Sequence, residues 1–365
     1  MIQNKVRQDN TWLVVDPIVG CQHDCQYCFL QLYKGKTKCK GEVVMSPEEA
    51  INELTTYWAF CPTSMVMIGS ETDMFMNSQN IDFLYKFIEL YDKKGIVNPL
   101  SLATKCYIPD EFITFVKSLK NTKIIFYISY SGLGSDIEPY IKKDKVKTNF
   151  IRLNEASQHV IHLWRPMTPQ NSTYETLEKV LNDVKGATCS VMRGLNLNPE
   201  LQKKVWFWAE ARDKVIDFEK NVSAWPEVLD NNIKDLMKIF PDYPLFFKNS
   251  CAMAYVLKQP EFIRIYDTER CNKSYCPIPQ REICEKRFSD TTSISQSLVK
   301  EKLSKLNLTN DFTINSDHSI NIMGTLNHEQ VACLAQMLHC RLIVEKIITN
   351  HEWGGYVLGH EDIII

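Results

Sequence analysis

The sequence predicts an α/β protein, a partial (β/α)6 barrel that is followed by a cysteine-rich segment and a small α+β domain. Three observations lead to this prediction. Short apolar runs alternate with longer amphipathic segments over roughly the first 200 residues, and many of the cysteines gather in two clusters. The chain of 365 residues is also long enough for one large domain and a smaller one. Strands that alternate with helices imply a parallel sheet with right-handed crossovers.

Each expected barrel strand is a short run of β-branched or apolar residues, and helix-like segments follow most of them. The strands are expected at 12–19, 65–69, 100–104, 123–129, 159–164 and 187–192, and the helices at 46–60, 80–94, 109–120 and 173–185. In barrels of this type the loops that follow the strands carry the chemistry. Functional residues are therefore expected directly after each strand.

The chain divides into three parts by composition. Residues 1–240 are expected to form the barrel, 241–290 a cysteine-rich segment, and 291–365 a small α+β domain. In the last part, the patterns predict a helix at 297–308, a hairpin at 311–324, a helix at 329–340, a strand at 341–349 and a glycine-marked strand or turn at 353–359.

Charge and hydropathy limit the classes of function. The net charge of −2 gives no overall attraction for a polyanion. Lysine-rich stretches at 34–40 and 142–147 are expected to be solvated surface loops. The chain has no apolar stretch of the roughly 20 residues that a membrane span needs and no signal-peptide core, so a cytoplasmic protein is expected. Thirteen cysteines in a reducing compartment then point to metal ligation rather than disulfides.

The first cluster of cysteines follows the first expected strand. Cys21, Cys25 and Cys28 have the spacing C-x3-C-x2-C, and Tyr27 precedes the last of them. Three thiolates on a 4Fe-4S cluster leave one iron without a protein ligand, and that iron can bind an external molecule. The alternative is a structural zinc site that His23 or Cys39 completes.

A C-x3-C-x-aromatic-C motif on the first loop of a β/α protein resembles the radical S-adenosylmethionine superfamily. Two further patterns resemble the spore photoproduct lyase branch of this superfamily in particular. They are CFLQ, which begins with the last cysteine of the motif, and S-x-T-D at 70–73. The resemblance covers roughly residues 10 to 200. It implies an oxygen-sensitive 4Fe-4S cluster whose open iron chelates S-adenosylmethionine. The reduced cluster then cleaves this cofactor to a 5'-deoxyadenosyl radical, which abstracts hydrogen from a substrate.

The same resemblance suggests contacts to the cofactor. The candidates follow the expected strands or lie within the cysteine loop, and they are Tyr27, Gly69, Ser70, Glu71, Thr72, Asp73, Thr104, Lys105, Ser129, Ser131 and Arg165. A glycine permits a close backbone approach. Arginine suits a carboxylate because its planar fork binds both oxygens. For each candidate, the alternative is a polar residue at a strand end with a structural role.

The second cluster of cysteines comprises Cys251, Cys271, Cys276 and Cys284. Four thiolates could hold a second 4Fe-4S cluster, similar to the auxiliary clusters of the SPASM and twitch branches, and the alternative is a four-cysteine zinc site. A cysteine beside a substrate radical can donate a hydrogen atom. Cys251, Cys106 and Cys189 are the candidates for that role.

We therefore expect a radical S-adenosylmethionine enzyme that acts on a peptide or on a small polar metabolite such as a sugar or nucleoside, with a flavodoxin- or ferredoxin-type reductant as its partner. The first alternative is a lyase-like enzyme that acts on nucleic acid, which is less favoured because the chain has no sustained basic stripe. The second is a non-catalytic protein in which two zinc sites organise an interaction surface.

Overall fold

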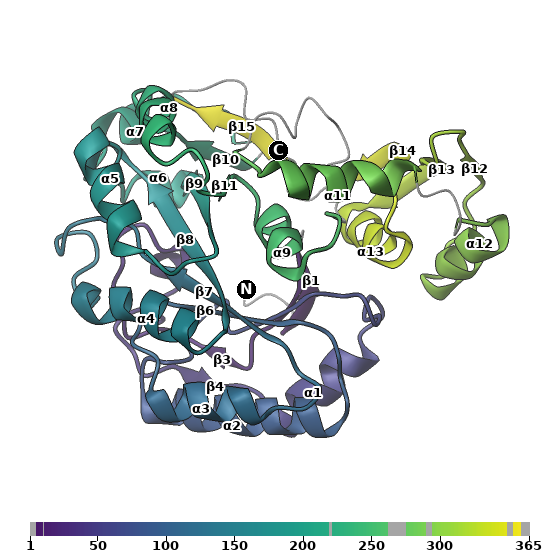
Figure 1. The fold of residues 1–365 in the computed structure, drawn as a ribbon, viewed down its shortest axis with the longest axis horizontal. Coiled ribbons are helices and arrows are strands. Elements are labelled where there is room, and N and C mark those ends of the chain that lie inside the picture. Colours follow the sequence, from purple (N-terminus) through teal and green to yellow (C-terminus); the bar gives the residue numbers. More distant parts are fainter. Residues whose placement is uncertain are drawn as a thin grey trace.

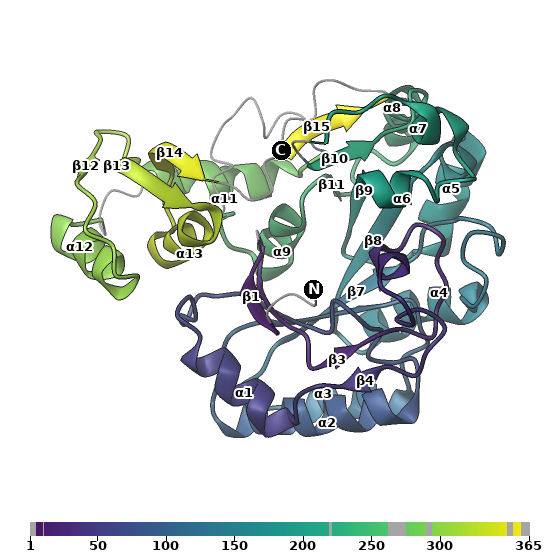
Figure 2. The same ribbon diagram turned by 180° about the vertical axis from the view of Figure 1, so that it is seen from behind.

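The computed structural model describes residues 5–9, 11–218, 221–261, 275–289, 294–348 and 353–358. A curved sheet dominates this structure, and helices cover its convex side (Figures 1 and 2). Six parallel strands lie side by side in chain order, as the sequence predicts. They are β2 (Leu13–Val15), β5 (Val66–Ile68), β6 (Leu100–Thr104), β7 (Ile124–Ser129), β8 (His159–Met167) and β9 (Cys189–Leu197).

Further strands extend the sheet at both edges. On one side β1 (Val6–Gln8) pairs antiparallel with β2. On the other side β10 (Asn221–Ala224) pairs antiparallel with β9, and β11 (Leu245–Phe246) pairs parallel with it. A separate two-stranded ladder joins β3 (Ile18–Val19) to β4 (Glu42–Val43) and closes the base of the cysteine loop.

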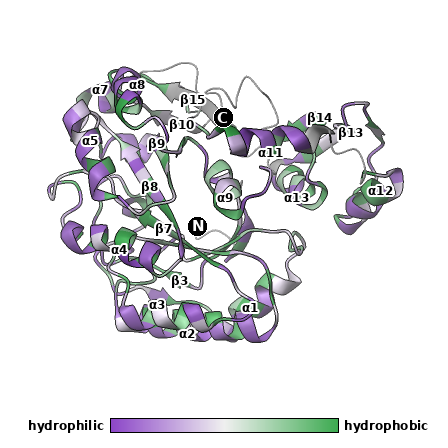
Figure 3. Cartoon of the chain, viewed as in Figure 1, coloured by the Kyte–Doolittle hydropathy of each residue, from purple (hydrophilic) through white to green (hydrophobic). Residues whose placement is uncertain are grey.

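The four predicted helices are present as α1 (Pro47–Thr56), α2 (Ser78–Lys93), α3 (Asp110–Ser118) and α5 (Tyr174–Asp183). Their starts follow from the sequence. Ser46 and Glu49 form a capping box at α1, and the Thr173 side chain caps α5. Residues of these helices alternate between hydrophobic and hydrophilic in Figure 3, as expected for helices with one buried face.

The prediction of a surface loop at 142–147 is wrong, because α4 (Lys143–Glu155) begins there. This helix buries Val146, Phe150 and Leu153, which recur at helical spacing. Lysines and polar residues occupy the positions between them. These residues masked the helical spacing of the apolar residues in the sequence.

The concave side of the sheet is filled by α9 (Asn249–Leu257), which both ribbon views place inside the curve (Figures 1 and 2). Ala252, Met253 and Val256 of this helix belong to the same buried cluster as Tyr127 and Val191 of the strands. The strands thus bury both faces, which explains their continuous apolar runs. The sequence did not predict this helix inside the barrel.

The small C-terminal sheet contains β12 (Phe312–Ile314), β13 (Ile320–Asn327) and β14 (Leu342–Ile348). With α12 (Gln296–Lys305) and α13 (His328–Leu338), these strands confirm the predicted order of helix, hairpin, helix and strand. The last strand, β15 (Trp353–Val357), instead pairs with β10 of the large sheet. The division into three domains stays a prediction.

The remaining helices are α6 (Pro199–Gln202), α7 (Ala209–Asp213), α8 (Leu229–Ile239) and α11 (Ile278–Ser289). None of the described helices combines the length and apolarity that a bilayer span requires.

Candidate metal and cofactor site

The cysteine loop leaves the sheet directly after β2 and β3 and folds back on itself. The Cys21 amide donates to the Lys36 carbonyl, and the Cys39 amide donates to the Cys21 carbonyl. Gly20 enters the loop with a φ of +107°, where a Cβ atom would lie 2.6 Å from Cys39 Sγ. A glycine is therefore required where the loop begins.

The three thiols of the motif lie on one loop, near enough for Cys25 and Cys28 to raise the pKa of Cys21, and they are largely shielded from water. Cys25 is buried, and Cys21 and Cys28 are partly buried. Burial raises the pKa of all three thiols, and their mutual repulsion adds to the pKa of Cys21; the pKa of Cys25 rises to about 12. Three adjacent thiolates are thus unfavourable unless a cation binds them. This soft donor set fits an iron-sulfur cluster or zinc.

The second candidate segment, residues 69–73, lies beside the cysteine loop. The Gly20 amide donates to the Glu71 carbonyl over 2.9 Å, and Thr72 Oγ1 donates to the Gly20 carbonyl over 2.7 Å. Gly69 has a φ of +78°, and the Cβ of another residue there would clash with Met74. The structure therefore brings these two predicted parts of the site together.

Asp16 holds this segment in place, although the sequence did not predict it. Its carboxylate accepts from the Ser70 amide, the Ser70 hydroxyl and the Glu71 amide, and it pairs with Arg7 at 2.6 Å. An acidic residue directly after a buried strand is the signal that could have identified it.

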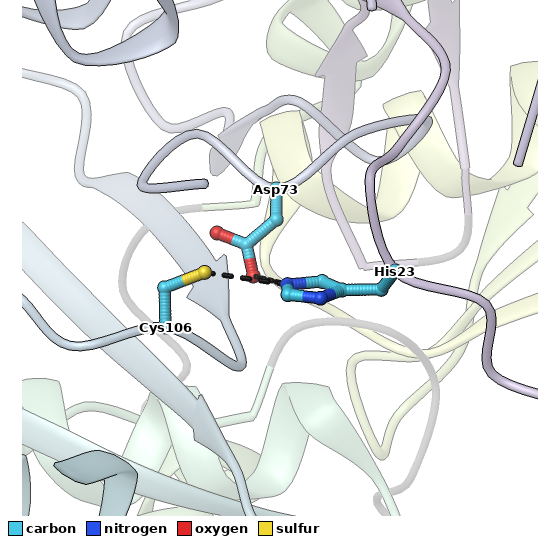
Figure 4. Close-up of side chains that lie close together, drawn as sticks. All are labelled: His23, Asp73 and Cys106. Carbon is cyan, nitrogen blue, oxygen red and sulfur yellow. Dashed lines mark hydrogen bonds and ion pairs between the residues drawn. The ribbon is translucent and has the colours of Figure 1, made fainter. Parts of the chain in front are cut away.

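Asp73 links the same segment to the end of β6. It accepts from Thr104 Oγ1 and from the Lys105 amide, each over 2.7 Å. His23 Nε2 lies 3.7 Å from Asp73 Oδ2 and 3.3 Å from Cys106 Sγ (Figure 4). Thr104, Lys105 and Cys106 thus lie next to the cysteine loop. The side chain of His23 thus contacts this group, while its backbone hydrogen-bonds to the thiol of Cys21.

Glu138 joins the cysteine loop to the ends of β6 and β7. Its carboxylate accepts from Tyr27 Oη, from Lys105 Nζ over 2.7 Å and from Ser131 Oγ over 2.6 Å. Despite burial, these donors hold the pKa of Glu138 below its ordinary value, and Lys105 is the strongest of them. No local pattern marks Glu138 in the sequence, because an acidic residue in a loop ordinarily faces solvent.

Arg165 and Ser129 lie at the ends of β8 and β7. Ser129 is buried, and Arg165 is partly exposed. Desolvation and the nearby charge of Arg193 lower the pKa of Arg165 to about 10. Its guanidinium makes no hydrogen bond or ion pair with any residue that the structure describes.

Four other candidate cysteines, Cys189, Cys251, Cys276 and Cys284, lie away from the cysteine loop in the described part of the chain. Cys189 is the first residue of β9, is fully buried, and belongs to the apolar cluster against which Cys251 and Cys276 pack. Cys284 on α11 accepts from Gln280 Nε2 over 3.4 Å. Cys271 lies outside the described residues.

Comparisons with known proteins bear on the fold. No protein-family model matches the chain, and no curated protein matches it by sequence. A spore photoproduct lyase double mutant solved with S-adenosylmethionine and dinucleoside spore photoproduct matches at a TM-score of 0.50 and 14% identity, over 68% of this chain and 80% of that one. The chain shares the fold of spore photoproduct lyase.

This likeness to the lyase confirms the predicted partial barrel, and at such low identity it establishes the fold alone. Streptococcus suis SuiB bound to S-adenosylmethionine also matches, at a TM-score of 0.42 and 10% identity, over 68% of this chain and 54% of that one.

Proposed function

We propose that this chain is a radical S-adenosylmethionine enzyme. The carrying observation is the group of three shielded thiols, Cys21, Cys25 and Cys28, on the first loop of a barrel with the lyase fold. These thiols fit a 4Fe-4S cluster with one open iron. When bound, the cluster supplies the electron that cleaves S-adenosylmethionine to methionine and a 5'-deoxyadenosyl radical, which takes hydrogen from the substrate.

The chain's own residues would position these groups. Asp16 and Gly20 fix residues 69–73 against the cysteine loop, and Glu138 fixes Tyr27 and Lys105. Contacts that are already in place can hold reacting groups without a rearrangement of the protein. We propose cofactor contacts at residues that lie at or after the ends of β5, β6, β7 and β8, and at Tyr27 in the cysteine loop. They are Tyr27, Gly69, Ser70, Glu71, Thr72, Asp73, Thr104, Lys105, Ser129, Ser131 and Arg165.

The candidate hydrogen donors differ in position. Cys106 lies 3.3 Å from His23, within the group that borders the cysteine loop. Cys189 begins its strand and is fully buried among apolar residues, and Cys251 packs against the same apolar cluster. We therefore favour Cys106 as the donor.

A second 4Fe-4S cluster on Cys251, Cys271, Cys276 and Cys284 is part of the proposal. Cys251 and Cys276 pack against one apolar cluster, and Cys284 lies on the helix that follows Cys276. A four-cysteine zinc site remains the alternative.

The proposed substrate is a peptide or a small polar metabolite, and a flavodoxin- or ferredoxin-type protein would supply the electron. The second candidate is an enzyme that acts on nucleic acid, which the S-x-T-D pattern and the sequence CFLQ favour.

Iron and sulfide counts on anaerobically reconstituted protein test the cluster assignments. About eight irons per chain are expected, about four after Cys25→Ala, and about four after Cys276→Ala. Cys61→Ala is the control, because Cys61 is a buried cysteine outside both motifs. Zinc in place of iron in every preparation would refute the proposal.

A further inference from the structure

A lysine-rich segment is hydrogen-bonded to the first cysteine of the motif. Residues 34–40 contain four lysines and no acidic residue. The Cys21 amide donates to the Lys36 carbonyl over 3.0 Å, and the Cys39 amide donates to the Cys21 carbonyl over 3.1 Å. The segment therefore lies directly beside the backbone of a proposed cluster ligand, although the residues proposed to hold the cluster and the cofactor do not include it.

Part of the positive charge of this segment has no counter-ion. Lys36 and Lys38 form ion pairs with neighbouring carboxylates, at 2.9 Å and 2.8 Å. Lys34 and Lys40 are exposed, and neither forms an ion pair within the described residues. Lysines without a counter-ion attract an anionic partner and speed its approach. The chain as a whole carries a net charge of −2, so this attraction is local to the segment.

An exposed aromatic pair adjoins these lysines. The 3-10 helix η1 (Phe29–Leu32) directly follows the cysteine motif, and Phe29 is 41% exposed. The Phe29 and Tyr33 rings meet edge to face, with their centres 6.5 Å apart. Lys204 reaches the same place, where its Nζ donates to the Gln31 carbonyl over 2.5 Å. An aromatic centre with a charged rim is a common composition of protein docking surfaces.

The size and place of this surface indicate which kind of partner it fits. We define the docking surface as Phe29, Tyr33, Lys34, Lys40 and Lys204. Contacts between electron-transfer proteins are small and short-lived, so a few charges around one aromatic centre suffice for them. A nucleic acid would instead be held by a longer row of phosphate contacts. The docking surface also borders the loop that would hold the cluster, which is where an electron must arrive.

We propose that the docking surface binds a small acidic electron-carrier protein, which passes one electron to the bound cluster. The inference rests on the proposed function and names the place where its reductant binds. The carrier is oxidised by one electron, the cluster is reduced by one electron, and no covalent bond forms or breaks. Lys34 and Lys40 attract the acidic partner, and Phe29 contacts an apolar group at the centre of its surface.

Binding of a reduced acidic flavodoxin to the iron-loaded full chain, measured anaerobically by biolayer interferometry, tests the docking surface. The double variant Lys34→Glu/Lys40→Glu should weaken binding about tenfold, and added salt should weaken binding of the unchanged chain. Lys86→Glu/Lys179→Glu is the matched control, because these lysines of α2 and α5 are also exposed and unpaired within the described residues. Equal weakening in both double variants, or no binding by the unchanged chain, would overturn the inference.

A comparison of reductants separates docking from support of the cofactor site. With flavodoxin as reductant, Lys34→Glu/Lys40→Glu should need about tenfold more flavodoxin for the half-maximal rate of 5'-deoxyadenosine formation. Dithionite needs no docking surface, so its rate should not change. Equal losses with both reductants would place these lysines in the support of the site and overturn the inference.

Two further outcomes distinguish the proposals. If the iron-loaded chain forms no 5'-deoxyadenosine with either reductant, the proposed enzyme is refuted, and flavodoxin binding that depends on Lys34 and Lys40 still supports the docking surface. If Lys34→Glu/Lys40→Glu loses binding of a single-stranded oligonucleotide and keeps binding of flavodoxin, the occupant is a nucleic acid and the inference fails.

Discussion

The ammonium group of Lys105 lies 2.7 Å from Glu138 Oε1, and this pair connects the end of β6 to the cysteine loop through Tyr27. Only 1% of the Glu138 side chain and 16% of the Lys105 side chain are exposed. The ammonium also lies 5.6 Å from the centre of the Tyr27 ring. A buried carboxylate with these partners fixes the positions of groups from three separate segments.

Replacing Glu138 by Gln should therefore destabilise the protein strongly. The substitution leaves the Lys105 charge without its carboxylate, a change that costs about 3–5 kcal/mol for buried pairs. Lys105→Met in the same chain removes the unpaired charge, so the double variant should recover part of the lost stability. Urea unfolding of the two single variants and the double variant measures this coupling. Additive effects would contradict the pairing.

Gly20→Ala should lower both stability and iron loading. The φ of +107° disfavours any side chain, and the added Cβ would lie 2.6 Å from Cys39 Sγ. Gly35→Ala is the matched control, because Gly35 also has a positive φ of +73° but has no atom within 4 Å of an added Cβ. Strain alone costs about 1–2 kcal/mol. Gly20→Ala is expected to lose more thermal stability and more bound iron than Gly35→Ala. Equal losses in the two variants would contradict a role for the close packing of Gly20 against Cys39.

Acid should destabilise the fold through His162. Its Nδ1 lies 2.7 Å from Ser190 Oγ and its Nε2 lies 2.8 Å from the Tyr130 carbonyl, and burial lowers the pKa of this histidine to about 3. Because the pKa in the folded state lies below the unfolded value of about 6.5, the unfolded chain binds a proton between these values that the folded chain does not.

The free energy of unfolding should thus fall by about 1.4 kcal/mol per pH unit as the pH drops below about 6.5. Urea titrations at pH 7 and pH 5 measure this loss. His162→Gln should have lower stability at pH 7, and its loss on acidification should be smaller. An equal pH dependence in both proteins would assign the acid sensitivity to other groups.

Cys106 should determine whether solvent hydrogen reaches the cofactor product. A thiol hydrogen exchanges with water, so a reaction in D2O without substrate should yield 5'-deoxyadenosine that carries deuterium. Cys106→Ala should reduce this incorporation, whereas Cys189→Ala should not, because Cys189 is fully buried at the start of β9. Mass spectrometry of the product measures the label. If Cys106→Ala leaves the deuterium content of 5'-deoxyadenosine unchanged, Cys106 is not the hydrogen donor.

The six barrel strands were predictable because each is an apolar run buried on both faces. The charged positions of α4 masked its apolar period, and the position of α9 inside the barrel depends on packing that no local pattern encodes. Within the site, strand-end positions identified Thr104, Lys105 and residues 69–73. Asp16 acts on Ser70, which is 54 positions away, and Glu138 acts on Tyr27, which is 111 positions away. Such tertiary contacts cannot be deduced from spacing alone.

Formation of 5'-deoxyadenosine tests the central claim most directly. Anaerobically reconstituted protein with S-adenosylmethionine and dithionite should yield methionine and 5'-deoxyadenosine, and Cys25→Ala should yield neither. A zinc-loaded protein that forms no 5'-deoxyadenosine under these conditions would contradict the account.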